Sequence, residues 1–422
     1  MEQSIFSGIR PLYSSLKGSP NEMEFRIRMR DFIDPSVLRS AVDTTMKRYP
    51  YFCVELLKKN DQYVFIDNAR PVTISHAPHG ADLNSKEANM HMLSFAWYDN
   101  WIVMDIFHGL TDGTGAYEVI RTLLYYYCSE RYGVKLDEEG IRLAGDEISS
   151  EEWIDPLEKA EDLPTPVRME MPKAINLAEA AGLGDDHERT VYSITIPESE
   201  FMHFNIENDG SPATIVALFL CRAIAKMYPD AEDAIRVALC INQRKAFKAP
   251  LAHQSLVGGA MLEYKDKMQS WPLSRQATAF RGMVFVQSQD EAVLAGANNT
   301  KGLTQMLLSK KTDEERLGVA AYVGSMASTL LCATVSYVGK ANYKGAEKYI
   351  RDFRSLTTPS GGTLLIEIAA VNGKFTLDVI QPFSSPIYVE AFLKELEDNS
   401  ITYDLQEVMK PELPNIRLPW SE

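Results

Sequence analysis

A histidine, an aspartate and a glycine stand at fixed spacing in His108-Gly109-Leu110-Thr111-Asp112-Gly113, an HxxxDG pattern. The histidine directly follows the strongly apolar segment Trp101–Phe107 and precedes a segment of helical character. The ordinary pKa of histidine, about 6.5, suits it to remove a proton at neutral pH. A loop at the end of a strand is also where a rigid scaffold presents a reactive side chain, so the pattern makes His108 a candidate general base.

A structural role competes with this interpretation. Taken alone, the motif favours a satisfied loop histidine that caps the following helix, because HxxxDG patterns also arise by chance. Asp112 is expected to be structural under either interpretation, since it can fix the turn by binding a cation or backbone amides. Gly113 and Gly115 allow the chain to turn sharply into the helix.

The elements that position the motif can be predicted from periodicity and end signals. Alternating apolar residues predict a half-buried strand over 23–30, and Asp34-Pro35 starts a helix that runs to about Arg48. Hairpins are predicted at 51–57 with 62–66 and at 95–98 with 101–107, and the motif leads into a helix over 114–127.

The later part of the chain repeats this mixture of strands and helices. Its predicted strands are 190–196, 236–242, 257–264 and a hairpin of 362–371 with 374–380, joined by Asn372-Gly373. Helices are predicted at 212–227, within 276–312 and at 387–398. Mixed elements in both halves indicate two α/β sandwich-like layers.

Length and charge limit the possible functions. The chain has 422 residues, 45% of them apolar, and a net charge of −15, so it can bury a large core but suits nucleic acid poorly. Between Asp137 and Asp162, eleven acidic residues accompany two basic ones, which accounts for −9 of that charge. This composition predicts a solvated, acidic and proline-rich crossover at 137–188 between subdomains at 1–136 and 189–422.

Compartment and membrane signals are also readable. The N-terminus lacks a signal-peptide pattern, which predicts a cytoplasmic protein. The 23 uncharged residues from Leu317 to Gly339 are long enough to span a bilayer, but eight of them are Gly, Ser or Thr, so a buried helix-to-strand passage is expected instead. The cysteines are odd in number and widely spaced, which predicts free, buried thiols: Cys53, Cys128, Cys221, Cys240 and Cys332.

The succession of strand, HxxxDG loop and helix resembles the CoA-dependent acyltransferase superfamily. This superfamily includes chloramphenicol acetyltransferase, nonribosomal-peptide condensation domains, plant BAHD acyltransferases and alcohol acetyltransferases. The resemblance covers nearly the whole chain and is nearest to stand-alone bacterial alcohol acetyltransferase-like or condensation-like proteins. It implies an α/β (α+β) fold of two chloramphenicol-acetyltransferase-like sandwich subdomains with a tunnel at their interface.

The resemblance also implies residue roles. His108 looks like the base that deprotonates an acceptor hydroxyl or amine, and Gly113 completes the motif. Asp112 would point away from the substrate and form a structural salt bridge with Arg244, which matches the family's Asn-x-Arg pattern in Ile241-Asn242-Gln243-Arg244. A late family strand resembles Val335–Gly339, which makes Ser336 the implied donor to an oxyanion.

Two departures from the family pattern are visible. Phe107 occupies the place where many members carry a first histidine, but the second histidine is the base in the family. The DFGWG motif of the plant BAHD branch is absent, which argues against that branch.

The implied function is transfer of an acetyl or short acyl group from acyl-CoA to a small alcohol or amine. The CoA thioester is then a co-substrate, and no permanently bound cofactor is implied. Two alternatives stay open: an acyl donor attached to a carrier protein, and a catalytically silent member that binds a ligand or partner. No metal site is expected, because His76 and His79 flank a proline without a nearby cysteine or well-spaced carboxylate.

Overall fold

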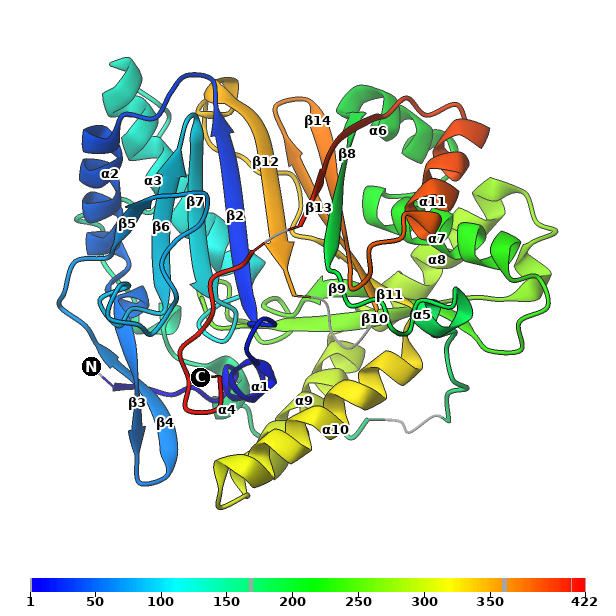
Figure 1. Ribbon diagram of the computed structural model, residues 1–422, viewed down its shortest axis with the longest axis horizontal. Helices are drawn as coiled ribbons and strands as arrows, with labels where there is room; N and C mark the ends of the chain where they lie inside the picture. Colours follow the sequence, from blue (N-terminus) through cyan, green and yellow to red (C-terminus); the bar gives the residue numbers. More distant parts are fainter. Residues whose placement is uncertain (1, 167–169, 359–362, 411, 422) are drawn as a thin grey trace.

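The chain folds into two α/β halves that lie side by side (Figure 1). The computed structural model describes residues 2–166, 170–358, 363–410 and 412–421. A five-stranded sheet forms one half and a seven-stranded sheet the other, and a small three-stranded sheet adjoins the first half. The predicted fold class is therefore confirmed.

The first half is built on a five-stranded sheet in the order β12-β2-β7-β6-β5. Its predicted helix start is confirmed, because the Asp34 carboxylate accepts hydrogen bonds from the first backbone amides of α2. The elements of this half, with the small sheet β1-β4-β3, are β1 (Glu2–Gln3), α1 (Ile9–Ser14), β2 (Glu22–Met29), α2 (Pro35–Arg48), β3 (Val54–Lys59), β4 (Gln62–Asp67), β5 (Ile74–His76), β6 (Leu93–Tyr98), β7 (Trp101–Phe107) and α3 (Gly113–Tyr132).

The second half is built on a seven-stranded sheet in the order β10-β9-β11-β13-β14-β8-β15. The predicted Asn372-Gly373 turn is present, with φ of 50° and 77°, as a tight hairpin between β13 and β14 requires. The predicted first strand began at Gly362, which lies outside the described residues. The strands of this half are β8 (Thr190–Pro197), β9 (Ile235–Asn242), β10 (Val257–Tyr264), β11 (Ala333–Tyr337), β13 (Leu364–Val371), β14 (Lys374–Gln381) and β15 (Asp404–Met409).

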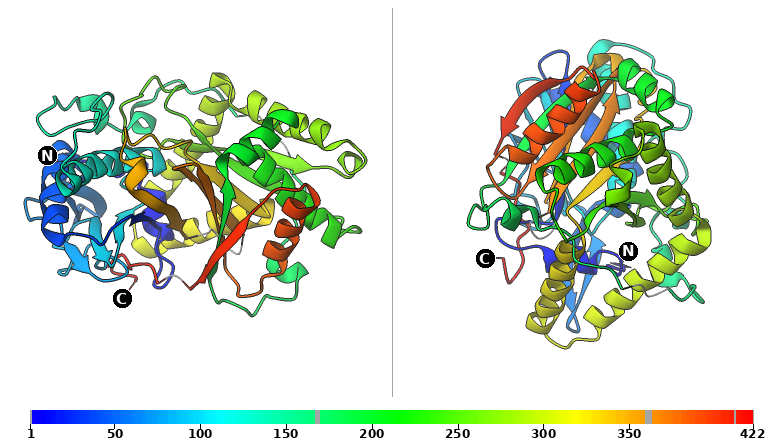
Figure 2. Two further views of the ribbon diagram at one scale, coloured as in Figure 1. Left: turned by 90° about the horizontal axis from the view of Figure 1, so that it is seen from above. Right: turned by 90° about the vertical axis from the view of Figure 1, so that its right-hand side faces the viewer.

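Helices cover one face of the larger sheet, and a helical pair extends away from it (Figures 1 and 2). The predicted helical stretch 276–312 is in fact two helices, since the chain breaks at Ser288-Gln289. The helices are α6 (Glu198–Glu207), α7 (Pro212–Met227), α8 (Leu273–Gln287), α9 (Asp290–Leu308), α10 (Asp313–Leu330) and α11 (Ile387–Asp398).

One strand crosses from the later chain into the first sheet. Strand β12 (Ile350–Thr357) pairs antiparallel with β2 and also contacts β13 and β14 of the larger sheet. This strand therefore belongs to the sheet of the first half, although it lies within the range 189–422. The boundaries 1–136, 137–188 and 189–422 stay a prediction for the units of the chain.

The uncharged segment 317–339 forms a helix and a strand, as expected, but the helix is not buried. On α10, Tyr322 is 62% exposed and Met326 47% exposed. The small residues of this segment therefore do not mark a buried helix. Within the described residues, no single helix is long and apolar enough to cross a membrane. Helices α6 and α7 reach the required length and apolar composition only when they are taken together, and the chain bends by 77° between them.

The first part of β2 is covered on both faces, although its alternating sequence predicted one solvated face, and only near its end is a side chain of that face, Arg28, exposed. Its glutamates Glu22 and Glu24 are fully buried, as is Asp105 on the neighbouring strand β7. The end of the chain passes in front of β2 in Figure 1 and places Met409 against Arg26. The backbone amide of Gly80 donates to the Asp105 carboxylate at 2.7 Å. Burial, together with the nearby Asp105 charge, raises the pKa of Glu22.

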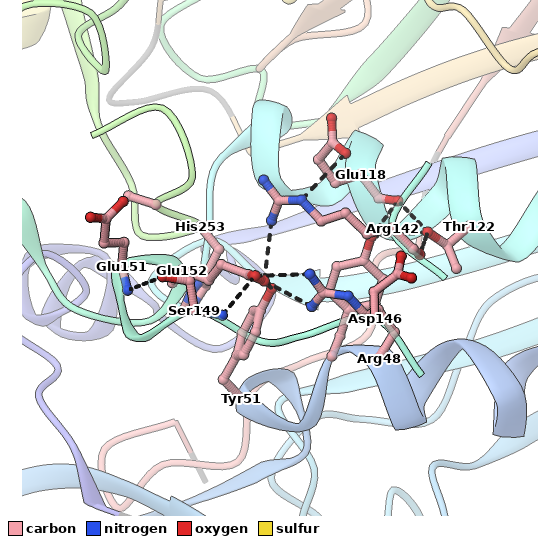
Figure 3. Close-up of polar contacts among 12 residues, drawn as sticks. Arg48, Tyr51, Glu118, Thr122, Arg142, Asp146, Ser149, Glu151, Glu152 and His253 are labelled. Carbon is pink, nitrogen blue, oxygen red and sulfur yellow. Dashed lines mark hydrogen bonds and ion pairs between the residues drawn. The ribbon is translucent and has the colours of Figure 1, made fainter. Parts of the chain in front are cut away.

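The acidic crossover is anchored rather than simply solvated. Short helical turns interrupt it at η2 (Ser150–Glu152), α4 (Pro156–Lys159) and α5 (Leu177–Ala180). Glu152 is buried, and Figure 3 shows Arg48, Tyr51 and Arg142 converging on its carboxylate. Arg48 binds both carboxylate oxygens at 2.8 Å. Burial alone would raise the pKa of Glu152, but the hydrogen bonds from Arg48 and Tyr51 outweigh it and lower the pKa.

This buried carboxylate predicts a large stability effect. Glu152→Ala should lower the free energy of unfolding by about 3–5 kcal/mol, because it leaves the buried Arg48 guanidinium without its counter-charge. The exposed neighbour Glu151 provides the control, and Glu151→Ala should change stability by less than about 0.5 kcal/mol. Urea unfolding followed by circular dichroism measures both. Equal losses in the two variants would contradict a structural role for the Glu152 cluster.

Candidate active site

His108 lies in the turn between β7 and α3 and borders a cavity. Its backbone amide donates to the Asn21 carbonyl at 3.0 Å, which ties the turn to the chain before β2. Its Nδ1 lies 3.1 Å from the carbonyl oxygen of Thr111. A carbonyl only accepts hydrogen bonds, so Nδ1 carries the proton of the neutral ring and Nε2 keeps its lone pair. The ring is thereby prepared to accept a proton at Nε2.

Asp112 begins α3 and is fully buried. Its two oxygens accept from both terminal nitrogens of Arg244 at 2.9 Å, so the predicted salt bridge is present. The backbone amides of Leu256 and Gly115 donate to the same carboxylate at 2.9 and 3.2 Å. With these four hydrogen bonds, Asp112 is a positioning residue of the turn.

Arg244 is also fully occupied. Its backbone amide donates to the Asn242 side chain at 3.0 Å, which explains why asparagine two residues earlier suits this turn. Two of its remaining guanidinium hydrogens reach the carbonyls of Ala252 and Gln254 at 2.8 and 3.1 Å, and the third reaches the Asn242 side chain at 3.4 Å. The pair thus joins the turn after β7 to the loops after β9 and before β10.

Close packing explains one glycine of the motif helix. At Gly115, an added Cβ would collide with the Thr111 hydroxyl and lie 2.9 Å from the His253 carbonyl oxygen. At Gly113, it would lie 2.8 Å from a methyl group of Val338, just after β11. The start of α3 and the end of β11 therefore meet, which brings His108 and Ser336 to one cavity.

That cavity has a volume of about 420 Å³ and lies between the two halves. Its walls come from α1, β2 and β12 on one side and from β9, β11 and β13 on the other. Helices α9 and α10 close part of it with apolar side chains. Asp112, Gly113 and Ser336 border the cavity with His108, whereas the side chain of Arg244 stays behind Asp112.

A row of polar side chains crosses the cavity-facing side of the larger sheet. Ser336 on β11 lies directly opposite Glu367 on β13, which in turn lies opposite Asp378 on β14. Desolvation raises the pKa of Glu367 to about 7, and hydrogen bonding by Ser336 opposes part of that shift. Desolvation also raises the pKa of Asp378 to about 7, against the nearby Arg354 charge. Both carboxyl groups therefore take up protons near neutral pH.

Two cavity residues escaped the sequence analysis. Glu367 could have been found, because a single acid within the apolar strand Leu364–Val371 is costly to bury and needs a reason. Arg10 on α1 carried no such signal, since nothing in the sequence separates it from an ordinary surface arginine. His253 also escaped notice, and burial lowers its pKa to about 4, so its ring is neutral at pH 7.

The two histidines considered as metal ligands, His76 and His79, make separate contacts. Within the described residues, no group of three or more His, Cys, Asp or Glu side chains is arranged to hold a metal ion. His76 instead stacks on Trp97, with ring centres 4.0 Å apart, and His79 binds the carbonyl of Gly80.

Solved structures of other proteins share this fold. Polyketide synthase associated protein 5 from Mycobacterium tuberculosis matches with a TM-score of 0.59 at 13% identity, over 94% of this chain and 96% of that chain. TRI101 of F. sporotrichioides, solved with coenzyme A and T-2, matches with a TM-score of 0.60 at 12% identity, over 95% and 98%. The condensation domain of the monacolin K polyketide synthase MokA matches with a TM-score of 0.59 at 12% identity, over 95% and 97%.

These similarities define the class by its fold. The chain shares the fold of these solved structures over nearly its whole length, and the predicted resemblance is confirmed for the fold. No family model matches the chain, and no curated protein matches it.

The ion pair at the motif predicts a stability difference between two helix-capping aspartates. Asp112→Ala should lower the free energy of unfolding by about 3–5 kcal/mol, because Arg244 would stay buried without a counter-charge. Asp34→Ala removes a half-buried cap without such a pair and should cost about 1 kcal/mol. Chemical denaturation measures both, and similar losses would contradict a stabilising role for the pair.

The raised pKa of Glu367 predicts a pH-dependent stability difference. The folded state favours the protonated carboxyl, so the folded protein binds more protons than the unfolded chain as pH rises from about 4.5 to 7. Wild-type stability should therefore fall over this range relative to Glu367→Gln, and the variant should be on the order of 1–3 kcal/mol more stable at pH 8. Denaturation midpoints from pH 4 to 8 measure the difference. An advantage that grows as pH falls would have the wrong sign.

Proposed function

We propose that this chain is an acyltransferase that moves an acetyl or short acyl group from a CoA thioester to a small alcohol or amine. The observation that carries the proposal is the placement of His108, whose Nδ1 is held by the Thr111 carbonyl while the ring borders a cavity of about 420 Å³. The fold shared with TRI101, which was solved with coenzyme A, supports the choice of donor.

In the proposed reaction, Nε2 of His108 removes the proton from the acceptor hydroxyl or amine. The acceptor oxygen or nitrogen then bonds to the thioester carbonyl carbon, and the carbonyl becomes an oxyanion. When this intermediate collapses, the carbon–sulfur bond breaks and the departing thiolate takes the proton from His108. A positioned base of this kind contributes about 10²–10⁴-fold to the rate.

Ser336 is the proposed donor to the oxyanion. It borders the same cavity as His108, on a strand whose end meets the start of α3. Its hydroxyl hydrogen is free for the oxyanion when Glu367 is protonated and itself acts as donor, so the raised pKa of Glu367 fits this role. One such donor is worth about 3–4 kcal/mol of barrier.

A carrier-protein donor is the second candidate. The similarity to the MokA condensation domain favours it, since that domain has the same fold over 97% of its length. The two donors are separated by comparing acetyl-CoA with an acetylated phosphopantetheine carrier protein at equal concentrations. A catalytically silent binding protein would release thiol from neither donor.

His108→Ala should lower kcat/KM for acceptor-dependent thiol release from acetyl-CoA by at least about 100-fold, because the acceptor loses its base. Free thiol is measured with a panel of small alcohols and amines. His203→Ala serves as the control, since His203 pairs with Glu207 on the exposed surface of α6 and does not border the cavity. Equal thiol release by wild type and His108→Ala would remove His108 from the mechanism.

A further inference from the structure

Arg10 brings a positive charge into the cavity that contains His108. It belongs to the short helix α1 and borders the cavity with Ser7, Pro11 and Ser14 of the same segment. Its side chain is partly buried, and desolvation lowers its pKa. A guanidinium stays protonated in proteins even so, hence the cavity wall carries a full charge.

Within the described residues, no hydrogen bond or ion pair neutralises Arg10. The fully buried arginines elsewhere in the described chain all have carboxylate partners, in the pairs Arg48–Glu152, Arg236–Glu263, Arg244–Asp112, Arg316–Asp313 and Arg354–Asp352. A cation partly removed from water without a partner is costly, so the cavity wall at Arg10 favours a bound anion.

The carboxyl groups that border the cavity leave Arg10 unpaired. Asp112 is occupied by Arg244 and two backbone amides. Glu367 lies on the larger sheet beside Ser336, and burial favours its neutral form up to about pH 7. A bound anion can therefore supply the counter-charge for Arg10.

We infer that Arg10 binds an anionic group, a carboxylate or a phosphate, on the molecule that is acylated at His108. This inference rests on the proposed acyltransferase function and specifies its acceptor. A planar guanidinium binds such oxyanions with two parallel hydrogen bonds, which fixes orientation as well as charge. The acceptor is then held at its acidic end while its hydroxyl or amine reaches Nε2 of His108.

The rest of the cavity wall indicates what the remainder of the acceptor molecule is like. Helices α9 and α10 contribute apolar side chains next to α1, namely Leu303, Leu307, Val319, Ala320, Val323 and Ala327. An apolar wall beside a single cation suits an amphipathic acid. The substrate class is thus a hydroxy acid, amino acid or phosphorylated alcohol with an apolar body.

The test compares matched acceptors that differ only in charge. With acetyl-CoA as donor, 3-hydroxyoctanoate is compared with 3-hydroxyoctanamide, and leucine with leucinamide. Wild type should prefer the carboxylates, and Arg10→Gln should lower the ratio of kcat/KM for carboxylate over carboxamide by about 10–100-fold. Arg10→Lys should retain part of the preference for the carboxylate, because it keeps the charge and loses the bidentate hydrogen bonding. The exposed Lys17 gives the control, and Lys17→Gln should leave the ratio unchanged.

Coenzyme A also carries phosphates, so a separate experiment must test whether Arg10 binds the donor. Arg10→Gln is assayed with acetyl-CoA and with S-acetyl-N-acetylcysteamine, a thioester without phosphate. If the variant raises KM for acetyl-CoA alone and leaves the acceptor ratio unchanged, Arg10 binds the donor and the inference is overturned. A ratio that falls with both donors supports acceptor binding.

A binding measurement keeps this inference separate from the proposed function. Calorimetric titration of His108→Ala protein with 3-hydroxyoctanoate should detect binding, and His108→Ala combined with Arg10→Gln should weaken it by at least about 10-fold. Absence of thiol release in every assay would refute the proposed function, while the titration would still decide whether Arg10 binds the carboxylate. Equal affinity of both proteins for 3-hydroxyoctanoate would overturn the inference.

Discussion

The carboxylate of Asp112 and the guanidinium of Arg244 lie buried where the two halves of the molecule meet. Two charges can stay in such a place only if nearly every donor and acceptor is satisfied, and four hydrogen bonds to Asp112 and two further carbonyls for Arg244 meet that demand. The turn that carries His108 is therefore fixed from the second half. A change in the relative position of the halves would disturb this pair.

The loop between β9 and β10 receives several of these ties. The Thr111 hydroxyl donates to the His253 carbonyl at 2.7 Å, and the His253 amide donates to the Glu152 carbonyl at 2.8 Å. The motif, this loop and the crossover are thus connected in series. Because Thr111 also accepts the Nδ1 hydrogen bond of His108, the ring tautomer depends on the same connections.

Local signals predicted the elements better than their burial. Asp34-Pro35 and Asn372-Gly373 determine a helix start and a turn through their own backbone chemistry, so they can be recognised without tertiary information. The resemblance at the HxxxDG motif placed Asp112 opposite Arg244, 132 residues away. Burial of Glu22 and Glu152 was missed because distant segments cover them, and sequence periodicity does not report what a distant segment covers.

The net charge of −15 gives the unpaired arginine its significance. An acidic surface repels anions, but at physiological salt its field is screened beyond about 8 Å, so it reaches the inside of the cavity weakly. Part of the acidic crossover is also neutralised internally, as the pairing of Glu152 with Arg48 shows. Within the cavity, the nearest charges therefore decide which molecules bind. Arg10 is a full positive charge there and Glu367 is neutral below about pH 7, so the local preference is for an anion although the chain as a whole is acidic.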